Sequence, residues 1–227
     1  MPTTPSVLVF DVNETLIDID SIAPLFGELF GDERVLREWF GQLVMYSMTV
    51  TMADCYADFF TLGRGILHML ADSYRVQVTD ADAHRLQEQM GAMPAHPDAV
   101  EALTALRDNG FRQVTLRNSP HRAGVATPLD NAGLASLFDE QLSVESCRAF
   151  KPAPVVYRYA CDTLGVAPAD CMMVAAHAWD LLGAHNVGFS TALVARPGNA
   201  PLLADGLARP TLVVDDLHDL AAKLIGS

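Results

Sequence analysis

The sequence predicts an α/β protein: a doubly wound parallel sheet with a helical cap inserted after the first strand. Two observations lead to this prediction. Short, continuous apolar runs alternate along most of the chain with longer stretches in which apolar residues recur at helical spacing. The interval between residues 20 and 96 departs from this alternation, because it has helical spacing throughout and no strand-like run. We therefore expect residues 1–19 and 97–227 to form the α/β core and residues 20–96 to form the cap.

The expected strands are the apolar runs of the core. Residues 7–10, Val-Leu-Val-Phe, form a continuous apolar run of the kind found in strands that are buried on both faces. Four later runs predict further strands at residues 114–116, 171–175, 191–194 and 211–214. Helices are expected near residues 98–109, 122–132, 153–164 and 179–187. The first of these helices follows Pro97 and ends before Gly110, which is the usual placement of Pro and Gly at helix termini.

The cap is expected to be helical because large apolar side chains recur there every three or four residues. They include Trp39, Phe40, Leu43 and Val44 in one stretch, and Phe59, Phe60, Leu67 and Leu70 in the next. An apolar cap helix over residues 39–50 can also pack against a second copy of the chain. A homodimer is therefore one expected assembly.

Composition and charge limit the classes of partner. Half of the 227 residues are hydrophobic, which is enough for a substantial core. The net charge of −13 argues against nucleic acid as a partner, because such a chain cannot neutralise a run of phosphates. The same charge would repel an anionic membrane surface. The expected partner is a small molecule.

Cysteine usage and the amino terminus favour a cytoplasmic location. The four cysteines form no CxxC pair and stand near no matching histidine cluster, so neither a disulfide framework nor a zinc site is expected. Residues 1–12 have no basic region before their short apolar run, unlike a signal peptide. No run of 18 apolar residues predicts a membrane span.

Polar and charged residues follow three of the expected strands. In an open parallel sheet, ligands bind beyond the carboxyl ends of the strands, so these residues are the candidates for a site. They are residues 11–15 after the first strand, 117–120 after the second and 176–180 after a later one, with Lys151 just before a helix. Asp11, Lys151 and Asp180 converging on one crevice can form a carboxylate nucleophile that a cation keeps ionised.

Four segments resemble the motifs of the haloacid dehalogenase superfamily. Residues 10–18, Phe-Asp-Val-Asn-Glu-Thr-Leu-Ile-Asp, are similar to its first motif. Asn118-Ser119-Pro120, residues 151–154 and residues 178–184 are similar to the second, third and fourth motifs, in the same order and with an insertion where the family carries its cap. The resemblance covers nearly the whole chain. It is strongest to the (S)-2-haloacid dehalogenase branch, because Tyr157 follows Lys151 by six residues and Trp179-Asp180 replaces an acidic pair.

Two absences separate this branch from the phosphatases of the superfamily. The phosphatases carry a second Asp two residues after the nucleophile, which protonates the departing alkoxide. Asn13 stands there and cannot act as a general acid, whereas a departing halide needs no proton. The phosphatases also bind Mg²⁺ through an Asp four residues before the position of Asp180, where this chain has Ala176. Neither a metal nor another cofactor is therefore expected.

The resemblance implies a role for each catalytic residue. Asp11 would attack C2 of a short 2-haloalkanoic acid to form an ester, which water would then hydrolyse. Lys151 would keep Asp11 ionised, Asp180 would position Lys151 or the hydrolytic water, and Thr15 would orient Asp11. Asn118 would donate to the halide or to the substrate carboxylate, which the backbone of Val12 and Asn13 could cradle. The residues expected to bind substrate are Val12, Asn13, Arg117, Asn118, Ser119, Tyr157, His177 and Trp179.

The lining of the expected site departs from the family in three places. The dehalogenases carry an arginine early in the cap that helps to receive the halide, within a Trp-Arg-x-x-Gln-Leu-like stretch, and the corresponding residues 38–43 have no Arg at that place. Arg117 replaces the Ser or Thr that precedes the motif-two Asn, and His177 replaces the Asn of a Ser-x-Asn sequence. Arg117 either supplies the missing cation from the core or is a surface residue. His177 either activates water, binds substrate or is structural, and Tyr157 and Trp179 either reach the site or simply pack.

The sequence thus favours a hydrolase that cleaves the carbon–halogen bond of a short 2-haloalkanoic acid. Two alternatives stay open at this point. One is a small-molecule phosphatase, and the other is an inactive relative that binds a ligand between core and cap. A carboxylate beside a lysine argues against the second alternative, because binding alone would not require that pair.

Overall fold

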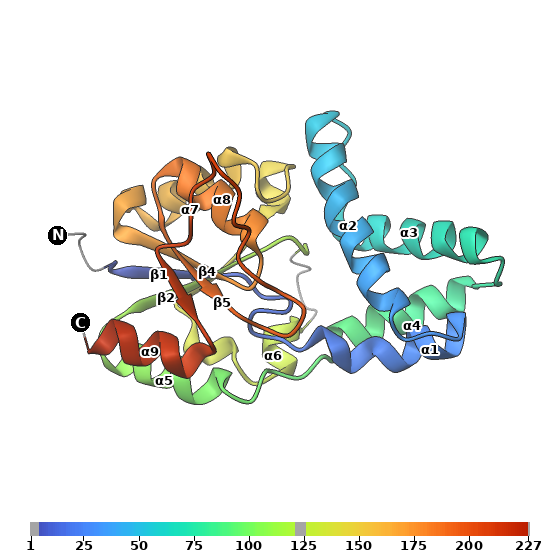
Figure 1. The fold of residues 1–227 in the computed structure, drawn as a ribbon, viewed down its shortest axis with the longest axis horizontal. Helices are drawn as coiled ribbons and strands as arrows, with labels where there is room; N and C mark the ends of the chain where they lie inside the picture. Colours follow the sequence, from blue (N-terminus) through green and yellow to red (C-terminus); the bar gives the residue numbers. More distant parts are fainter. Residues whose placement is uncertain (1–4, 121–125, 227) are drawn as a thin grey trace.

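The computed structural model describes residues 5–120 and 126–226. Its centre, within this part of the chain, is a fully parallel six-stranded sheet with the order β3-β2-β1-β4-β5-β6 (Figure 1). The strands are β1 (Val7–Phe10), β2 (Arg112–Arg117), β3 (Glu140–Ser143), β4 (Cys171–Ala175), β5 (Ser190–Val194) and β6 (Leu212–Val214). The order runs from β1 to β2 on one side and to β4 on the other, so the winding reverses at β1. The predicted doubly wound α/β fold is confirmed.

Helices cover both faces of the sheet. On one face α7 (Pro154–Leu164) packs against α8 (Ala178–Val187). On the other face α5 (Ala99–Asp108) packs against α9 (Leu217–Ile225) (Figure 1). Three of these helices match the expected ranges 98–109, 153–164 and 179–187, and the strands at 7–10, 114–116, 171–175, 191–194 and 211–214 are found within a residue or two.

Two expectations for the core were wrong. Strand β3 was not predicted, because its residues Glu-Gln-Leu-Ser form no apolar run. The strand lies at the sheet edge and pairs with β2 alone. The helix expected over residues 122–132 is the single turn α6 (Pro128–Asn131). Thr127 is extended and caps α6 in a reciprocal pair of hydrogen bonds with Asp130, so the helix begins there. Residues 122–125 of the expected helix lie outside the described residues.

Helices also fill the chain between β1 and α5. After the short 3-10 turn η1 (Ile19–Ile22) come α1 (Ala23–Phe30), α2 (Val35–Met52), α3 (Phe59–Tyr74) and α4 (Asp80–Gly91). In Figure 1 they stand beside the sheet rather than over either face. We call these four helices the cap.

The cap has its own packing centre at Trp39 of α2. The ring of Trp39 is fully buried, and its Nε1 donates to the carbonyl oxygen of Gly63 in α3 at 2.9 Å. A Cβ atom at Gly63 would lie 3.1 Å from the Trp39 ring, so glycine allows the two helices to approach this closely. Asp58 caps α3 and Thr79 caps α4 with side-chain oxygens, which fixes where these helices begin.

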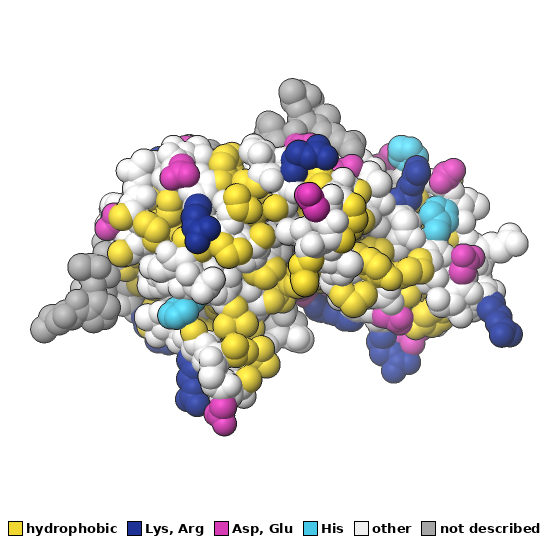
Figure 2. All heavy atoms as spheres, turned by 90° about the horizontal axis from the view of Figure 1, so that it is seen from above, with side chains coloured by type: hydrophobic (Ala, Val, Ile, Leu, Met, Phe, Trp, Pro, Cys, Tyr) yellow, Lys and Arg dark blue, Asp and Glu magenta, His cyan; other side chains and the backbone are white. Residues whose placement is uncertain are grey.

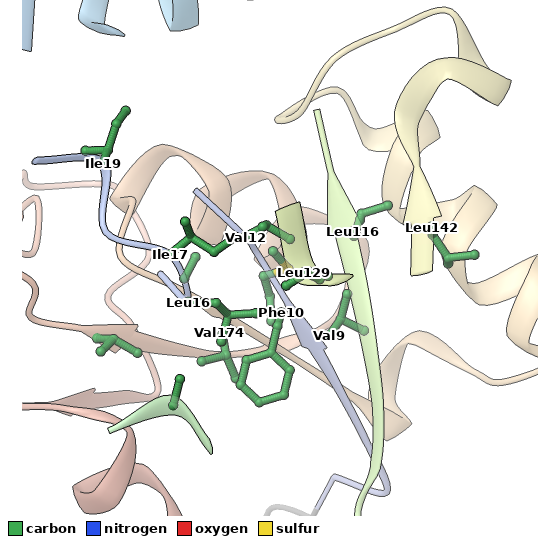
Figure 3. Packing of buried hydrophobic residues seen from close by; sticks show 14 of the residues in the cluster. Val9, Phe10, Val12, Leu16, Ile17, Ile19, Leu116, Leu129, Leu142 and Val174 are labelled. Atoms are coloured by element: carbon green, nitrogen blue, oxygen red, sulfur yellow. The ribbon is translucent and has the colours of Figure 1, made fainter. Parts of the chain in front are cut away.

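The turn after β1 rests on fully buried apolar side chains. Val9 and Phe10 of β1 pack among residues of the neighbouring strands, including Leu116 and Val174 (Figure 3). Leu16 belongs to the following turn and is also completely buried. Because both flanks of this turn are packed into the core, the residues between them are held in one conformation.

The surface mixes apolar and charged side chains. Hydrophobic side chains gather along the middle of the face in Figure 2, between scattered charged ones. On α2, Met45 and Met52 are 49% and 88% exposed. Met45 lies within residues 39–50, the stretch expected to contact a second copy, and the homodimer stays a prediction. No helix in the described ranges is long and apolar enough to cross a membrane.

Candidate active site

The candidate site lies at the carboxyl end of β1, where the winding of the sheet reverses. Asp11 directly follows β1, and its backbone N–H donates to the carbonyl oxygen of Val174 at 3.0 Å. Arg117 ends β2 and Asn118 follows it, while His177 follows β4. Because parallel strands end at one edge of the sheet, three segments far apart in the sequence meet around Asp11.

Both carboxylate oxygens of Asp11 are held by neighbouring side chains. Lys151 Nζ donates to Oδ1 at 2.8 Å, and Thr15 Oγ1 donates to Oδ2 at 2.9 Å. His177 Nδ1 lies 3.1 Å from Oδ2. The Thr15 hydroxyl oxygen accepts from the backbone N–H of Ala176 at 2.9 Å, which orients the hydroxyl toward Asp11. These contacts fix the orientation of the Asp11 carboxylate, each of whose oxygens accepts a hydrogen bond.

The charges around Asp11 keep it ionised. Burial alone would raise the pKa of Asp11, but the charge of Lys151 and the hydrogen bond and charge of His177 outweigh it and lower that pKa far below its ordinary value. Burial would lower the pKa of Lys151, yet Asp11 and Asp180 raise it, so the lysine remains charged. The site therefore contains a buried carboxylate whose low pKa favours the ionised form that an oxygen nucleophile requires.

Asp180 and Tyr157 support Lys151 from behind. Asp180 is completely buried, and its Oδ2 accepts from Lys151 Nζ at 2.6 Å. The Tyr157 hydroxyl donates to Asp180 Oδ1 at 2.6 Å. Burial, together with repulsion from Asp11, raises the pKa of Asp180 despite the opposing charge of Lys151. Burial and the Asp180 charge raise the pKa of Tyr157, so the phenol keeps the proton it donates.

Close packing holds α8 against the segment that carries Lys151. A Cβ atom at Gly183 would lie 2.6 Å from Cβ and from the carbonyl oxygen of Pro152, and 2.7 Å from the Tyr157 ring. Only glycine permits this approach. It places Asp180, in the first turn of α8, within hydrogen-bonding distance of Lys151.

A small pocket lies over the Asp11 carboxylate. Its volume is about 10 Å³, roughly the space for one water molecule. It is lined by Asp11, Asn13, Phe40, Val44, Phe59, Arg117, Asn118, His177 and Trp179, so both core and cap contribute to it. Five of the residues expected to bind substrate are among these: Asn13, Arg117, Asn118, His177 and Trp179.

The other three residues expected to bind substrate lie elsewhere. Tyr157 is fully buried behind Asp180. The Ser119 carbonyl oxygen accepts from Ser143 Oγ at 2.9 Å, and the Val12 carbonyl oxygen accepts from the N–H groups of the turn after Asp11. None of the three is among the residues that line the pocket.

Arg117 is the positively charged residue of the pocket lining among the described residues. It is 3% exposed, and burial lowers its pKa against the charges of Asp130 and Glu145. The cap arginines lie elsewhere. Arg34 is exposed beside Asp32, Arg37 pairs with Glu14 and Asp20, and Arg64 lines a separate cavity within the cap.

Two residues that contact His177, Phe40 and Glu14, were not among the predicted site residues. The Phe40 ring packs 5.8 Å from the His177 ring. The Trp179 ring also stacks with the His177 ring, at 5.0 Å between centroids. Glu14 Oε2 lies 2.6 Å from His177 Nε2. Its position three residues after Asp11 was visible in the sequence, but nothing there indicated that residue 177 would come back to it.

A metal or cofactor site does not emerge from the side chains around Asp11. Ala176 contributes only its backbone to the site, at the place where the phosphatases carry a ligating Asp. In the described ranges no cluster of three His, Cys, Asp or Glu side chains has the arrangement to hold a metal ion. Metal-independent activity is a prediction that chelation can test.

Known proteins similar to this chain are haloacid dehalogenases. The (S)-2-haloacid dehalogenase 4A of Burkholderia cepacia is 32% identical, with 85% of this chain and 84% of that protein covered. The (S)-2-haloacid dehalogenase 1 of Pseudomonas sp. (strain CBS-3) is 32% identical, with 83% of each chain covered. The solved structure of L-2-haloacid dehalogenase from Xanthobacter autotrophicus with chloropropionic acid covalently bound superposes with a TM-score of 0.88 at 26% identity, covering 98% of this chain and 99% of that chain. The sequence model of the haloacid dehalogenase-like hydrolase family matches residues 5–188 of this chain, and the chain therefore belongs to that family.

Proposed function

We propose that the protein hydrolyses the carbon–halogen bond of a short 2-haloalkanoic acid, giving a 2-hydroxy acid and halide. The observation that carries this proposal is the Asp11 carboxylate, which Lys151 keeps ionised at the floor of the pocket. Asn13 lines the same pocket where a phosphatase needs a general acid. The two curated relatives named above are (S)-2-haloacid dehalogenases, which supports the same chemistry.

The first step is displacement at carbon. An oxygen of Asp11 attacks C2 of the acid from the side opposite the halogen, so that a C–O bond forms as the C–halogen electron pair leaves with the halide. The carbon inverts, and no proton is needed. Arg117 and Asn118 line the pocket and can receive the two negative groups involved, the substrate carboxylate and the departing halide.

The second step regenerates the enzyme. Water attacks the carbonyl carbon of the Asp11 ester, the 2-hydroxy acid departs, and the carboxylate returns. Lys151 stabilises the oxygen on which negative charge develops, because its ammonium group already contacts Oδ1. Asp180 and Tyr157 keep the ammonium group in place, and Thr15 keeps the carboxylate plane oriented.

The pocket size predicts a short substrate and a cap that moves. A pocket of about 10 Å³ holds no haloacid, so Phe40 and Phe59 of the cap must separate from the core for substrate to enter. The alkyl chain of a longer 2-haloacid would hold Phe40 and Phe59 away from the core and leave Asp11 exposed to water. We infer a two- or three-carbon acid on this ground. The homodimer and the cytoplasmic location are further predictions.

A release assay tests the proposal. The purified protein is incubated with chloro, bromo and fluoro 2-haloacids of increasing length and with a generic phosphate ester, with and without EDTA. Halide release from a short 2-haloacid, insensitive to EDTA, is expected. Phosphate release that depends on Mg²⁺ would establish a phosphatase instead, and binding without any release would establish an inactive relative.

A further inference from the structure

His177 separates two pockets and contacts a carboxylate in each. Its Nδ1 lies 3.1 Å from Asp11 Oδ2 in the catalytic pocket, and its Nε2 lies 2.6 Å from Glu14 Oε2. The side chain is only 6% exposed and is held between Phe40 and Trp179. The ring therefore cannot swing away from either carboxylate without disturbing its aromatic neighbours.

Glu14 lies between His177 and a second pocket. This pocket, of about 150 Å³, is lined by Glu14, Asp18, Ile19, Asp20, Arg37, His96, Arg196 and Pro197. Glu14 Oε2 faces His177, whereas Oε1 contacts Arg37 and lies 3.4 Å from Asn199 Nδ2. The side chains of Arg37 and Asp20 are 39% and 50% exposed, so water reaches this side of Glu14.

The backbone of Glu14 is in a conformation that favours glycine. Its φ is +61°, in the left-handed region that a residue with a Cβ atom occupies at a cost. The side chain that carries its carboxylate is also only 6% exposed. A strained backbone and a buried charge both oppose folding, which points to a role for this side chain in the reaction.

Asp180 is poorly placed to activate the hydrolytic water. One of its oxygens accepts from Lys151 and the other from Tyr157, each at 2.6 Å. The side chain is 0% exposed and does not line the catalytic pocket. His177 does line that pocket and has a ring nitrogen beside the carboxylate that the water must attack.

We propose that His177 is the general base of ester hydrolysis and that Glu14 passes the released proton to the second pocket. This rests on the proposed function. Before the first step, Nδ1 faces a carboxylate and donates to it. Formation of the ester removes the charge of Asp11, so the ring releases one proton by way of Glu14 to water in the second pocket. The proton that remains on the ring lies on Nε2 and is donated to Glu14, and Nδ1 presents a lone pair. The first half of the reaction thereby prepares the base for the second.

Each proton of the hydrolytic step has a destination among these atoms. As the water oxygen bonds to the Asp11 carbonyl carbon, one water proton moves to His177 Nδ1. The Nε2 proton stays with its Glu14 partner, so the ring regains the proton that it released when the ester formed and can again donate to Asp11 from Nδ1. The other water proton stays on the tetrahedral oxygen and passes to the alkoxide as the C–O bond breaks. Asp11 returns as a carboxylate, and one proton has been released.

The test uses Glu14→Gln, which keeps the shape and the hydrogen bond to His177 but cannot carry a proton. Rapid mixing with a 2-haloacid that the wild type dehalogenates should still release one equivalent of halide per active site at the wild-type rate. Intact-protein mass spectrometry should then find the Asp11 ester accumulating. Steady-state kcat should fall roughly 10²-fold, with KM falling in parallel because the ester is the dominant species.

Two further variants and a control interpret that result. His177→Gln should show the same burst and the same accumulation of ester. Glu28→Gln removes an exposed carboxylate of the cap that pairs with Arg85, and it should behave as wild type. Glu14→Gly relieves the backbone and removes the acceptor, so it should accumulate the ester without loss of thermal stability.

Specific outcomes would overturn the inference. If Glu14→Gln turned over normally while Glu14→Gly did not, Glu14 would only position the ring. If His177→Gln abolished the halide burst, His177 would serve the nucleophile and not the water. If the wild type released no halide from any 2-haloacid, the proposed function itself would fail, which is a different result.

Discussion

The two sides of the Asp11 carboxylate are built differently. On the inner side, Lys151, Asp180 and Tyr157 are almost completely excluded from water, and their polar atoms pair at 2.6–2.9 Å. On the outer side, Phe40 and His177 line a pocket together with side chains of both core and cap. Removing one partner of a buried charge pair strongly destabilises a protein, whereas residues that line a pocket can be replaced without loss of the fold. The inner side keeps Asp11 ionised as the nucleophile, and the outer side selects the substrate that reaches it.

Replacing the nucleophile should have the largest effect. Asp11→Asn keeps the hydrogen-bonding shape but removes the negative oxygen, so halide release should fall by several orders of magnitude. Thermal melting should change little. Mass spectrometry must first exclude deamidation back to Asp, and activity above a few per cent in the verified Asp11→Asn variant would contradict the mechanism.

Removing the inner cation should make activity sensitive to acid. The pKa of Asp11 lies far below its ordinary value, so wild-type halide release in a single turnover should be flat from neutral pH to about pH 5. Lys151→Met raises the pKa of Asp11, so more of it is protonated and the burst should decline as the pH is lowered through this range. A flat profile in the variant would show that Lys151 does not control the charge of Asp11.

Lys151→Met should also destabilise the fold, because Asp11 and Asp180 then repel each other without a cation. A loss of about 3–5 kcal/mol is expected from breaking a buried charge pair, measured by urea unfolding at pH 7. Lys223→Met is a matched control, since that lysine pairs with Asp219 on the exposed side of α9.

On the outer side, Arg117 should matter for binding the acid. The Arg117→Lys variant cannot form two parallel hydrogen bonds to a carboxylate. The loss of transition-state stabilisation, calculated from kcat/KM, should be about 1.5–3 kcal/mol. Arg117→Ala should be at least as damaging without unfolding the protein. Steady-state kinetics and thermal melts of both variants decide this, and near-normal kinetics would move the anion-binding role to another residue.

Tyr157→Phe should separate the two sides most cleanly. Loss of the hydroxyl leaves one oxygen of Asp180 without its donor, so stability should fall by about 1–3 kcal/mol and kcat by less than about tenfold. KM should stay unchanged because Tyr157 does not line the pocket. A selective rise in KM would mean that Tyr157 reaches the substrate after all.

The smallest effect should come from chelation. Neither Asn13 nor Ala176 supplies what a phosphatase uses to bind Mg²⁺ and protonate an alkoxide. EDTA should leave halide release at the wild-type rate. Inactivation that Mg²⁺ reverses would reopen the phosphatase alternative.

The sequence predicted the inner side of the site and most of the fold, because both depend on local patterns. Buried strands are apolar runs, and motif residues lie at fixed distances from strand ends. The edge strand β3 was missed because a strand paired on one side needs no apolar run. The contact of Glu14 with His177 joins residues 163 positions apart, and no spacing in the chain encodes it. The orientation of Ser119 and Tyr157 likewise depends on packing, which a motif does not report.

Gly183 has a practical consequence for anyone who would change the substrate of this protein. It lies outside the pocket, yet even the methyl group of alanine would push α8 from Pro152 and carry Asp180 away from Lys151. In a randomised library, clones altered at this position would look inactive for reasons unrelated to the substrate. Positions 40 and 44 line the pocket and leave that helix contact untouched, so diversity should be concentrated there.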